Sequence, residues 1–203
     1  MSNCIRVIND CIVKSSKFFI THQMTFEQRG LVKKWDYLKV ADAVSIMIYH
    51  KTDRNFVLIK QFRPPIYANA TNTERNENKE CGVCYEMCAG LLDKKGLTAK
   101  ETACIEIFEE CGYKVTPERL RDISYGSVGI SGRKMYSYYV EVDESDKKGS
   151  GGGNKSEGEM IDQFLLPETQ VDSFLFDDTK PKTPLMFQAF YWWKYMMNTK
   201  SKQ

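Results

Sequence analysis

Long apolar runs are absent from the sequence. Across its 203 residues no segment approaches the roughly 18 apolar residues that a membrane-spanning helix requires, and the amino terminus lacks the basic stretch and apolar core of a secretory signal. We therefore expect a soluble, unexported, cytoplasmic protein with no membrane partner.

Net charge is also small. The chain carries 29 Lys and Arg residues against 27 Asp and Glu residues, a formal charge of +2. A balance this close to neutral gives no broad positive field to attract a nucleic acid, so any anionic ligand is expected to be small. The length suffices for one substantial core but is short for two, which predicts a single domain over residues 1–203.

Histidine is scarce, which limits the metal sites that the cysteines could form. Cys81, Cys84 and Cys88 include a C-x-x-C pattern that is compatible with a zinc or redox site. A structural zinc ion takes four ligands in paired spacings, and the chain has only two histidines, His22 and His50. Reduced thiols are the favoured interpretation, because disulfides are rare in unexported proteins.

The first strands are marked by two apolar segments, 43–49 and 55–60, with a polar connector between them. This pattern predicts a β-hairpin. Pro64 and Pro65 must end the second strand, because neither can donate a hydrogen bond to a sheet, so the chain is expected to leave the sheet directly after Arg63.

Two polar stretches interrupt the pattern, at 68–79 and 143–158. Neither has a periodicity that could bury one face, so both are predicted to be surface loops or tolerated insertions, and the glycines of the second suggest mobility. Strands are expected at 134–142 and 160–166. The aromatic-rich segment 183–197 is expected to form a closing helix, packed on the body or on a partner subunit.

The segment after Gly90 contains a well-marked helix. Thr98, with Glu101 three residues later, forms a capping box, and Gly112 is typical of a helix end, so we expect a helix over about 99–111.

This helix is expected to have an apolar and an acidic face. The apolar face is predicted to comprise Ala103, Cys104, Ile107, Phe108 and Cys111, whereas Glu106, Glu109 and Glu110 share another stripe. Like charges one turn apart repel, and the helix dipole disfavours acids near the carboxyl end. A Mg²⁺ ion, which prefers carboxylate oxygens, would offset both effects. An ordinary solvated acidic face is the alternative.

The same region resembles a known motif. The matching residues are Gly90, Glu106, Glu109, Glu110, Gly112 and Tyr113, and the motif is the Nudix box, G-x5-E-x7-R-E-U-x-E-E-x-G-U, where U is aliphatic or aromatic. The segments 61–64 and 85–93 also resemble the branch of the Nudix hydrolases that acts on ADP-sugars and UDP-sugars. The resemblance covers most of the chain and implies an α/β fold, the Nudix α/β/α sandwich with a mixed β-sheet.

The resemblance also implies a metal site. Glu106 and Glu110 would bind Mg²⁺, with Mn²⁺ as the alternative ion, while Glu109 and the Ala89 carbonyl would be further ligands. Glu159 would bind metal or help to activate the attacking water. These four glutamates form the expected catalytic set.

Four other residues are implied to bind substrate. Arg63 would clamp the diphosphate through its fixed fork of donors, and Trp35 would stack on the nucleobase. Leu91 and Glu86 would line the pocket. Each role has a structural alternative, such as a surface charge for Arg63, a core position for Trp35 and a solvated loop acid for Glu159.

The sequence departs from the box at two positions. The interval from Gly90 to Glu106 is one residue longer than the pattern, and Gly96 or Leu97 occupies the place of the first glutamate. Ile105 stands where the box has an arginine that orients the catalytic glutamates.

Two basic residues, Lys60 and Arg133, are candidates for replacing that arginine. The implied activity is hydrolysis of the diphosphate of nucleoside diphosphate sugars, with UDP-glucose giving UMP and glucose 1-phosphate. ADP-ribose is the alternative substrate, and a nucleotide-sugar binding protein on a degraded Nudix scaffold is the non-enzymatic alternative. The resemblance further implies a homodimer in which strands of residues 1–40 make the contact.

Overall fold

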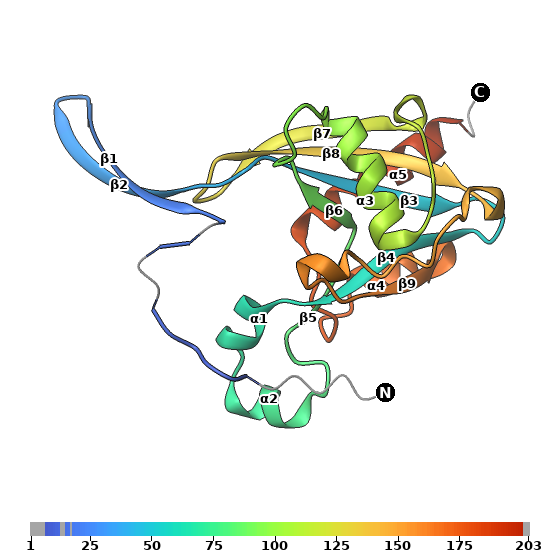
Figure 1. Ribbon diagram of the computed structural model, residues 1–203, viewed down its shortest axis with the longest axis horizontal. Helices are drawn as coiled ribbons and strands as arrows, with labels where there is room; N and C mark the ends of the chain where they lie inside the picture. Colours follow the sequence, from blue (N-terminus) through green and yellow to red (C-terminus); the bar gives the residue numbers. More distant parts are fainter. Residues whose placement is uncertain (1–6, 13–14, 17, 201–203) are drawn as a thin grey trace.

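The computed structural model describes residues 7–12, 15–16 and 18–200. An antiparallel hairpin of β1 (Ile20–Gln28) and β2 (Leu31–Lys39) projects away from the body of the molecule (Figure 1). Of the expected amino-terminal strand region, residues 7–12, 15–16 and 18–19 are in no strand, and residues 1–6, 13–14 and 17 lie outside the described residues.

A mixed sheet forms the centre of the described structure. Its strands are β3 (Ala43–His50), β4 (Asn55–Phe62), β5 (Val83–Glu86), β6 (Cys88–Leu91), β7 (Arg121–Val128), β8 (Arg133–Val142) and β9 (Ile161–Pro167). The main order is β5-β4-β3-β8-β7, while β6 also pairs with β3 and β9 with β4. The pairing of β3 with β8 is parallel and the others are antiparallel.

The predicted hairpin is present as β3 and β4, but the two strands pair only near the turn. Residues 48–50 of β3 pair with β4, whereas residues 43–46 pair with β6. β4 diverges from β3 and continues between β5 and β9. This change of partner gives β6 a place in the sheet, directly beneath the helix that carries the acidic residues.

Helices cover both faces of the sheet (Figure 1). They are α1 (Pro64–Asn69), α2 (Asn72–Glu77), α3 (Ala99–Cys111), α4 (Val171–Leu175) and α5 (Pro184–Lys200). Val44, Ile46 and Ile48 of β3 pack in a core cluster with α3, and the alternate residues Met47 and Tyr49 pack in a second cluster with α4 and α5. Every residue of β3 is buried. The layers confirm the expected α/β/α sandwich.

The prediction of an unstructured loop over 68–79 is wrong. Thr71 begins α2 with a capping box, in which its side chain accepts a hydrogen bond from the Glu74 N–H and its own N–H donates to the Glu74 carboxylate. These local bonds favour a short helix even though the segment has no apolar face to bury.

The second polar stretch is also more structured than expected. It contains two short 3₁₀ turns, Glu144–Asp146 and Lys155–Glu157, and its glycines make backbone hydrogen bonds with the end of α3. None of the helices in the described part of the chain is long and apolar enough to span a membrane.

Candidate active site

The helix α3 has the bounds that its capping residues predict. The Thr98 side chain accepts from the Glu101 N–H at 3.2 Å, and the Thr98 N–H donates to the Glu101 carboxylate at 2.8 Å. Gly112 ends the helix in the left-handed region, with φ +74°. A side chain at Gly112 would also overlap the Gly149 backbone, so glycine is required both by conformation and by close packing.

Two of the predicted acids are buried rather than solvated. Glu106 is 8% exposed and Glu110 is 3% exposed. Phe108, which was expected on the buried apolar face, is instead 43% exposed. The reason is that α3 contacts β6 as well as β3. The buried face of α3 therefore includes Glu106 and Glu110 and leaves Phe108 at the surface.

Gly90 on β6 provides the space for Glu106. A Cβ at Gly90 would overlap the side-chain carboxyl group of Glu106, so only glycine allows this carboxylate to lie against the strand backbone. Alanine at this position would displace the acid from the site.

Ala89, next along β6, is directed at the second acid. Its N–H donates to the Glu110 Oε2 at 3.1 Å. Because the N–H and C=O of a strand residue point to the same side, the Ala89 carbonyl is expected along the edge that faces Glu110. The backbone of β6 therefore lines the site with both polar groups of one residue.

Burial changes the titration of both acids. It raises the pKa of Glu106 to about 7, although the ammonium of Lys94 acts in the opposite direction. Burial raises the pKa of Glu110 to about 8, although hydrogen bonds from the Cys88 thiol and the Ala89 N–H favour its charged form. Each carboxylate is also disfavoured by nearby acidic side chains, including Glu159.

Lys94 supplies positive charge beside two of the acids, Glu109 and Glu106. Its Nζ lies 3.8 Å from the Glu109 Oε2, and its charge lowers the pKa of Glu106. Lys60, one of the two candidates for the place of the box arginine, pairs with Glu80 at 2.7 Å.

The other candidate, Arg133, lies at the first position of β8, opposite Val128. Lys94 was not identified from the sequence. Its only signal is its position in the segment that is one residue longer than the motif allows.

The glycine-rich segment closes the carboxyl end of α3. The N–H of Gly152 donates to the Glu110 carbonyl at 2.9 Å, and that of Gly153 donates to the Glu109 carbonyl at 3.0 Å. These donors satisfy carbonyls that a helix end leaves without partners. They also bring positive partial charge to the end of the helix where the acids gather.

The same segment carries Glu159 toward the acids. Glu159 Oε2 accepts from the Asn154 N–H at 2.8 Å, and the residue is partly buried. Its negative charge contributes to the raised pKa of both Glu106 and Glu110, so the three lie in one electrostatic neighbourhood. The oxygens of these three residues do not all lie within 4.8 Å of one another.

Arg63 lies at the edge of the acidic cluster. Its Nε donates to the Glu86 Oε1 at 2.7 Å and its Nη2 donates to the Glu86 Oε2 at 2.5 Å. This pair raises the pKa of Arg63, with a smaller contribution from the charge of Glu110. The arginine side chain is 42% exposed, so its remaining donors are accessible to a ligand.

The remaining predicted residues lie farther from this cluster or at its border. Leu91 is at the end of β6 and is 37% exposed. Trp35 is on β2, is 66% exposed, and belongs to the hairpin that projects away from the body (Figure 1). A single chain therefore does not bring Trp35 together with the glutamates.

The cysteine cluster does not form a metal site in the described residues. The ligand atoms of Cys81, Cys84 and Cys88 are not gathered within 4.8 Å, and all three thiols are free. Burial raises the pKa of Cys84 to about 12 and also raises that of Cys88, which disfavours the reactive thiolate.

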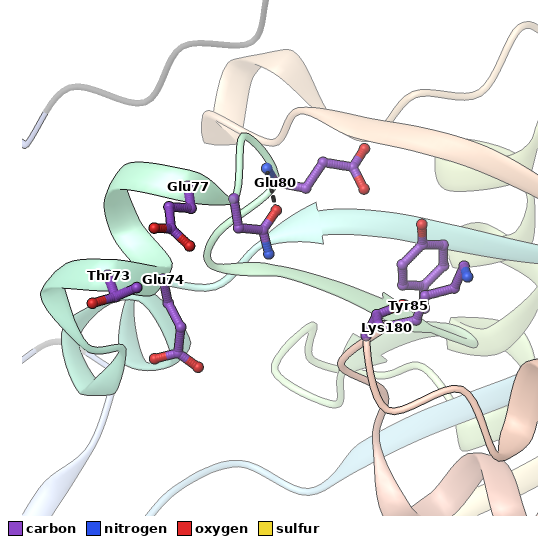
Figure 2. A pocket seen from close by; sticks show the side chains of 8 residues that line it. Thr73, Glu74, Glu77, Glu80, Tyr85 and Lys180 are labelled. Carbon is purple, nitrogen blue, oxygen red and sulfur yellow. Dashed lines mark hydrogen bonds between the residues drawn. The ribbon is translucent and has the colours of Figure 1, made fainter.

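A separate cavity of about 510 Å³ lies between α2 and the segment that precedes α5, and Figure 2 shows Glu74 and Glu77 on α2 across from Tyr85 and Lys180. Neighbouring residues of a strand point to opposite faces, so Tyr85 faces away from the side of β5 that carries Glu86. This cavity is therefore not part of the glutamate site.

The glutamate site is suited to a divalent cation. Buried carboxylates are costly unless positive charge offsets them, and the space kept open by Gly90 holds one of them against a polar backbone edge. Glu106, Glu110 and Glu159, with the Ala89 carbonyl, would offer oxygen donors of the kind that hard divalent cations take. The residues present therefore fit the expected ion.

Comparisons with known proteins agree with the motif. No protein-family profile matches the sequence. The uridine diphosphate glucose pyrophosphatase NUDT14 of Bos taurus is 37% identical over 188 residues, 83% of this chain and 85% of that protein. The GDP-mannose pyrophosphatase of Pectobacterium atrosepticum is 31% identical over 183 residues, 87% of this chain and 88% of that protein.

A solved structure has the same fold. The crystal structure of an ADP compounds hydrolase matches with a TM-score of 0.63 at 18% identity, over 94% of this chain and 95% of that one.

Proposed function

Because this chain belongs to the Nudix hydrolases, we propose that it is a metal-dependent nucleoside diphosphate sugar pyrophosphatase that converts UDP-glucose and water to UMP and glucose 1-phosphate. The observation that carries the proposal is the pair of buried acids, Glu106 and Glu110, held against Gly90 and Ala89 with Arg63 at the edge of the cluster.

The chemistry requires that negative charge on the diphosphate be neutralised and that a water attack phosphorus while the bond to the bridging oxygen breaks. A bound Mg²⁺ supplies charge neutralisation and lowers the pKa of water. Glu106 and Glu110 would hold the ion, and Arg63 would bind a phosphate oxygen through donors that Glu86 leaves free. Glu159 accepts a proton from the attacking water or acts as a further ligand.

UDP-glucose is favoured by the relative with 37% identity, which is named for that substrate. The bacterial relative at 31% identity is named for GDP-mannose, and ADP-ribose is the alternative that the sequence motifs suggest. The proposal therefore ranks UDP-glucose above ADP-ribose and GDP-mannose.

A homodimer would explain the position of Trp35. The hairpin of β1 and β2 carries exposed apolar side chains, among them Met24, Leu31, Val32 and Trp35. A two-stranded ribbon is marginally stable by itself, so packing against a second chain would bury these residues. In such a dimer Trp35 would stack on the nucleobase. The single-domain organisation and cytoplasmic location stay predictions.

The second candidate function is nucleotide-sugar binding with weak catalysis. It is favoured by Ile105, which replaces the box arginine. Lys94 favours the enzyme instead, because its ammonium places a positive charge beside Glu109, as the missing arginine would.

Product analysis tests the two functions. Wild type, Glu110→Gln and the control Glu77→Gln, an exposed position on α2, are each incubated with UDP-glucose, ADP-ribose or GDP-mannose, with and without Mg²⁺. We expect Mg²⁺-dependent UMP and glucose 1-phosphate from wild type and the control, and a loss of several orders of magnitude in Glu110→Gln. Binding of the nucleotide sugars without turnover by wild type would instead establish the binding function.

A further inference from the structure

A second polar cavity, of about 320 Å³, lies near the carboxyl end of α3 and apart from the glutamate site. Its lining includes His50 at the end of β3, Asp53 in the turn that follows, Tyr113 after α3, and Glu144 in the first 3₁₀ turn of the segment 143–158. Tyr113 is the last residue of the Nudix motif, but neither the motif nor the proposed reaction uses His50, Asp53 or Glu144.

His50 is the unusual member of this group. Its side chain is 3% exposed, yet its Nε2 has no hydrogen-bond partner among the described residues. A buried polar atom without a partner is costly, and an unseen water or ion commonly satisfies such an atom. Nε2 is directed toward Glu144, whose Oε1 lies 3.7 Å away, beyond hydrogen-bonding range.

The other ring nitrogen of His50 contacts Asp53. Nδ1 accepts a hydrogen bond from the Asp53 backbone N–H at 3.3 Å, and the Asp53 Oδ2 lies 3.2 Å from the same nitrogen. When a cation binds Nε2, the ring proton is held on Nδ1, where the Asp53 carboxylate can accept it. Nε2 then directs its lone pair at the ion, on the side of the ring that faces the Glu144 carboxylate.

A cation fits between these two atoms. Imidazole nitrogen and carboxylate oxygen each lie about 2.0–2.2 Å from a bound Zn²⁺, so two ligands of one ion are separated by up to about 4 Å. The ligand atoms of His50, Asp53 and Glu144 all lie within 4.8 Å of one another. A carboxylate that orients the back of a ligating histidine, as Asp53 does here, is a recurrent feature of such sites.

The charges around the cavity leave it attractive to a cation. Asp53 and Glu144 are acidic, and Lys147 is the basic residue in the lining. The Lys147 ammonium is occupied, because it donates to the Cys111 carbonyl at 2.8 Å and to the Gln163 side chain at 3.1 Å. The Lys51 ammonium, on the residue after His50, pairs with Asp143 at 2.7 Å.

We propose that His50 Nε2 and Glu144, with Asp53 orienting the imidazole, form a second divalent-cation site that selects a nitrogen-binding ion of the Zn²⁺ type over Mg²⁺. The imidazole ligand is the basis of that selection, because Mg²⁺ prefers oxygen. An ion here ties the turn between β3 and β4 to the start of the segment that caps α3 and carries Glu159. Two protein ligands leave positions that water would fill, and the site does not depend on the proposed hydrolysis.

Imidazole NMR tests this site directly, because the chain has only two histidines. Tag-free protein labelled with ¹⁵N-histidine is titrated with Zn²⁺ in excess Mg²⁺, which occupies sites made only of oxygen. We expect the His50 Nε2 resonance to shift as one equivalent of Zn²⁺ is added, while His22 stays unchanged. An unchanged His50, or equal shifts of both histidines, would overturn the proposal.

Two exposed acids give a matched pair of variants. Glu144→Gln is expected to weaken Zn²⁺ binding at least tenfold, whereas Glu157→Gln, in the same segment but outside the cavity lining, should not. Both substitutions are at the surface, so folding is retained and the imidazole signals report on each. Equal affinity in both variants would show that Glu144 is not a ligand and would exclude the site as proposed.

Discussion

Glu86 holds the guanidinium of Arg63 by two hydrogen bonds, from Nε and Nη2, and thereby fixes the direction of the donors that stay free. The carboxylate is 7% exposed and so is itself held in place by its surroundings. A planar guanidinium whose Nε and Nη2 are held by a carboxylate can bind a phosphate through its other N–H groups without changing orientation.

Arg63→Lys is therefore expected to weaken substrate binding. A lysine ammonium can pair with Glu86 but cannot also present a fixed second set of donors to a diphosphate. We expect KM for UDP-glucose to rise about tenfold or more, which corresponds to about 1.4 kcal/mol. Arg54→Lys is the control, because Arg54 pairs with Glu168 on the opposite side of the sheet from α3, and its KM should stay at the wild-type value. A KM unchanged in Arg63→Lys would remove Arg63 from the binding site.

Gly90→Ala is expected to abolish most activity. The added methyl group overlaps the Glu106 carboxyl group, which must then move away from β6. The matched control is Gly126→Ala on β7, where a Cβ has no atom within 4 Å. Steady-state rates with UDP-glucose and Mg²⁺ should fall at least a hundredfold in Gly90→Ala and remain close to wild type in Gly126→Ala. Comparable rates in the two variants would show that activity does not require the Glu106 carboxyl group to lie against the backbone of Gly90.

Glu110→Gln is expected to stabilise the metal-free protein at high pH while it removes activity. A carboxyl group whose pKa rises on folding, here to about 8, weakens the folded state progressively as pH increases from its ordinary value near 4.5 through 8. Glutamine cannot ionise, so it avoids this loss of stability, which is on the order of a few kcal/mol.

Thermal unfolding in a chelator checks this pH dependence. The midpoint of Glu110→Gln should exceed that of wild type by several degrees at pH 8.5, and the two should converge near pH 5. Adding Mg²⁺ should raise the wild-type midpoint more than that of the variant. A constant difference between the two proteins at every pH would contradict an origin in ionisation.

Lys94→Met is expected to lower kcat modestly. Lys94 is 40% exposed and lies 3.8 Å from the Glu109 carboxylate. Pairs of this kind contribute about 0.2–1 kcal/mol, which corresponds to a loss of up to about fivefold. Lys94→Arg should retain activity, and Lys95→Met, at the exposed neighbouring position, should match wild type. If all three variants behave alike, Lys94 does not take over the function of the missing arginine.

Local chemistry explains which features the sequence could predict. The bounds of α3 follow from Thr98, Glu101 and Gly112, whose effects depend on residues a few positions away. The acidic stripe follows from helical spacing alone. Its burial does not, because the buried side of α3 depends on β6, and β6 reaches that place only after β3 changes partner.

The features that were missed depend on contacts between distant segments. The glycines at 149–153 suggest mobility by composition, but Gly152 and Gly153 are ordered by carbonyls of α3, about 40 residues earlier. Lys94 could not be recognised because the loop before Thr98 determines where its side chain points. The short helix α2, in contrast, could have been found from the capping box at Thr71 and Glu74.

The parallel pairing of β3 with β8 has a consequence for synthesis of the chain. Ala43 is paired with Met135, 92 residues later, so β3 leaves the ribosome long before its neighbour in the sheet exists. Loop closure over that distance slows folding, and until β8 exists one edge of a strand rich in Val, Ile and Met stays unpaired and prone to associate with other nascent chains. The segment that forms the centre of the finished sheet is therefore expected to need protection from aggregation while translation is incomplete.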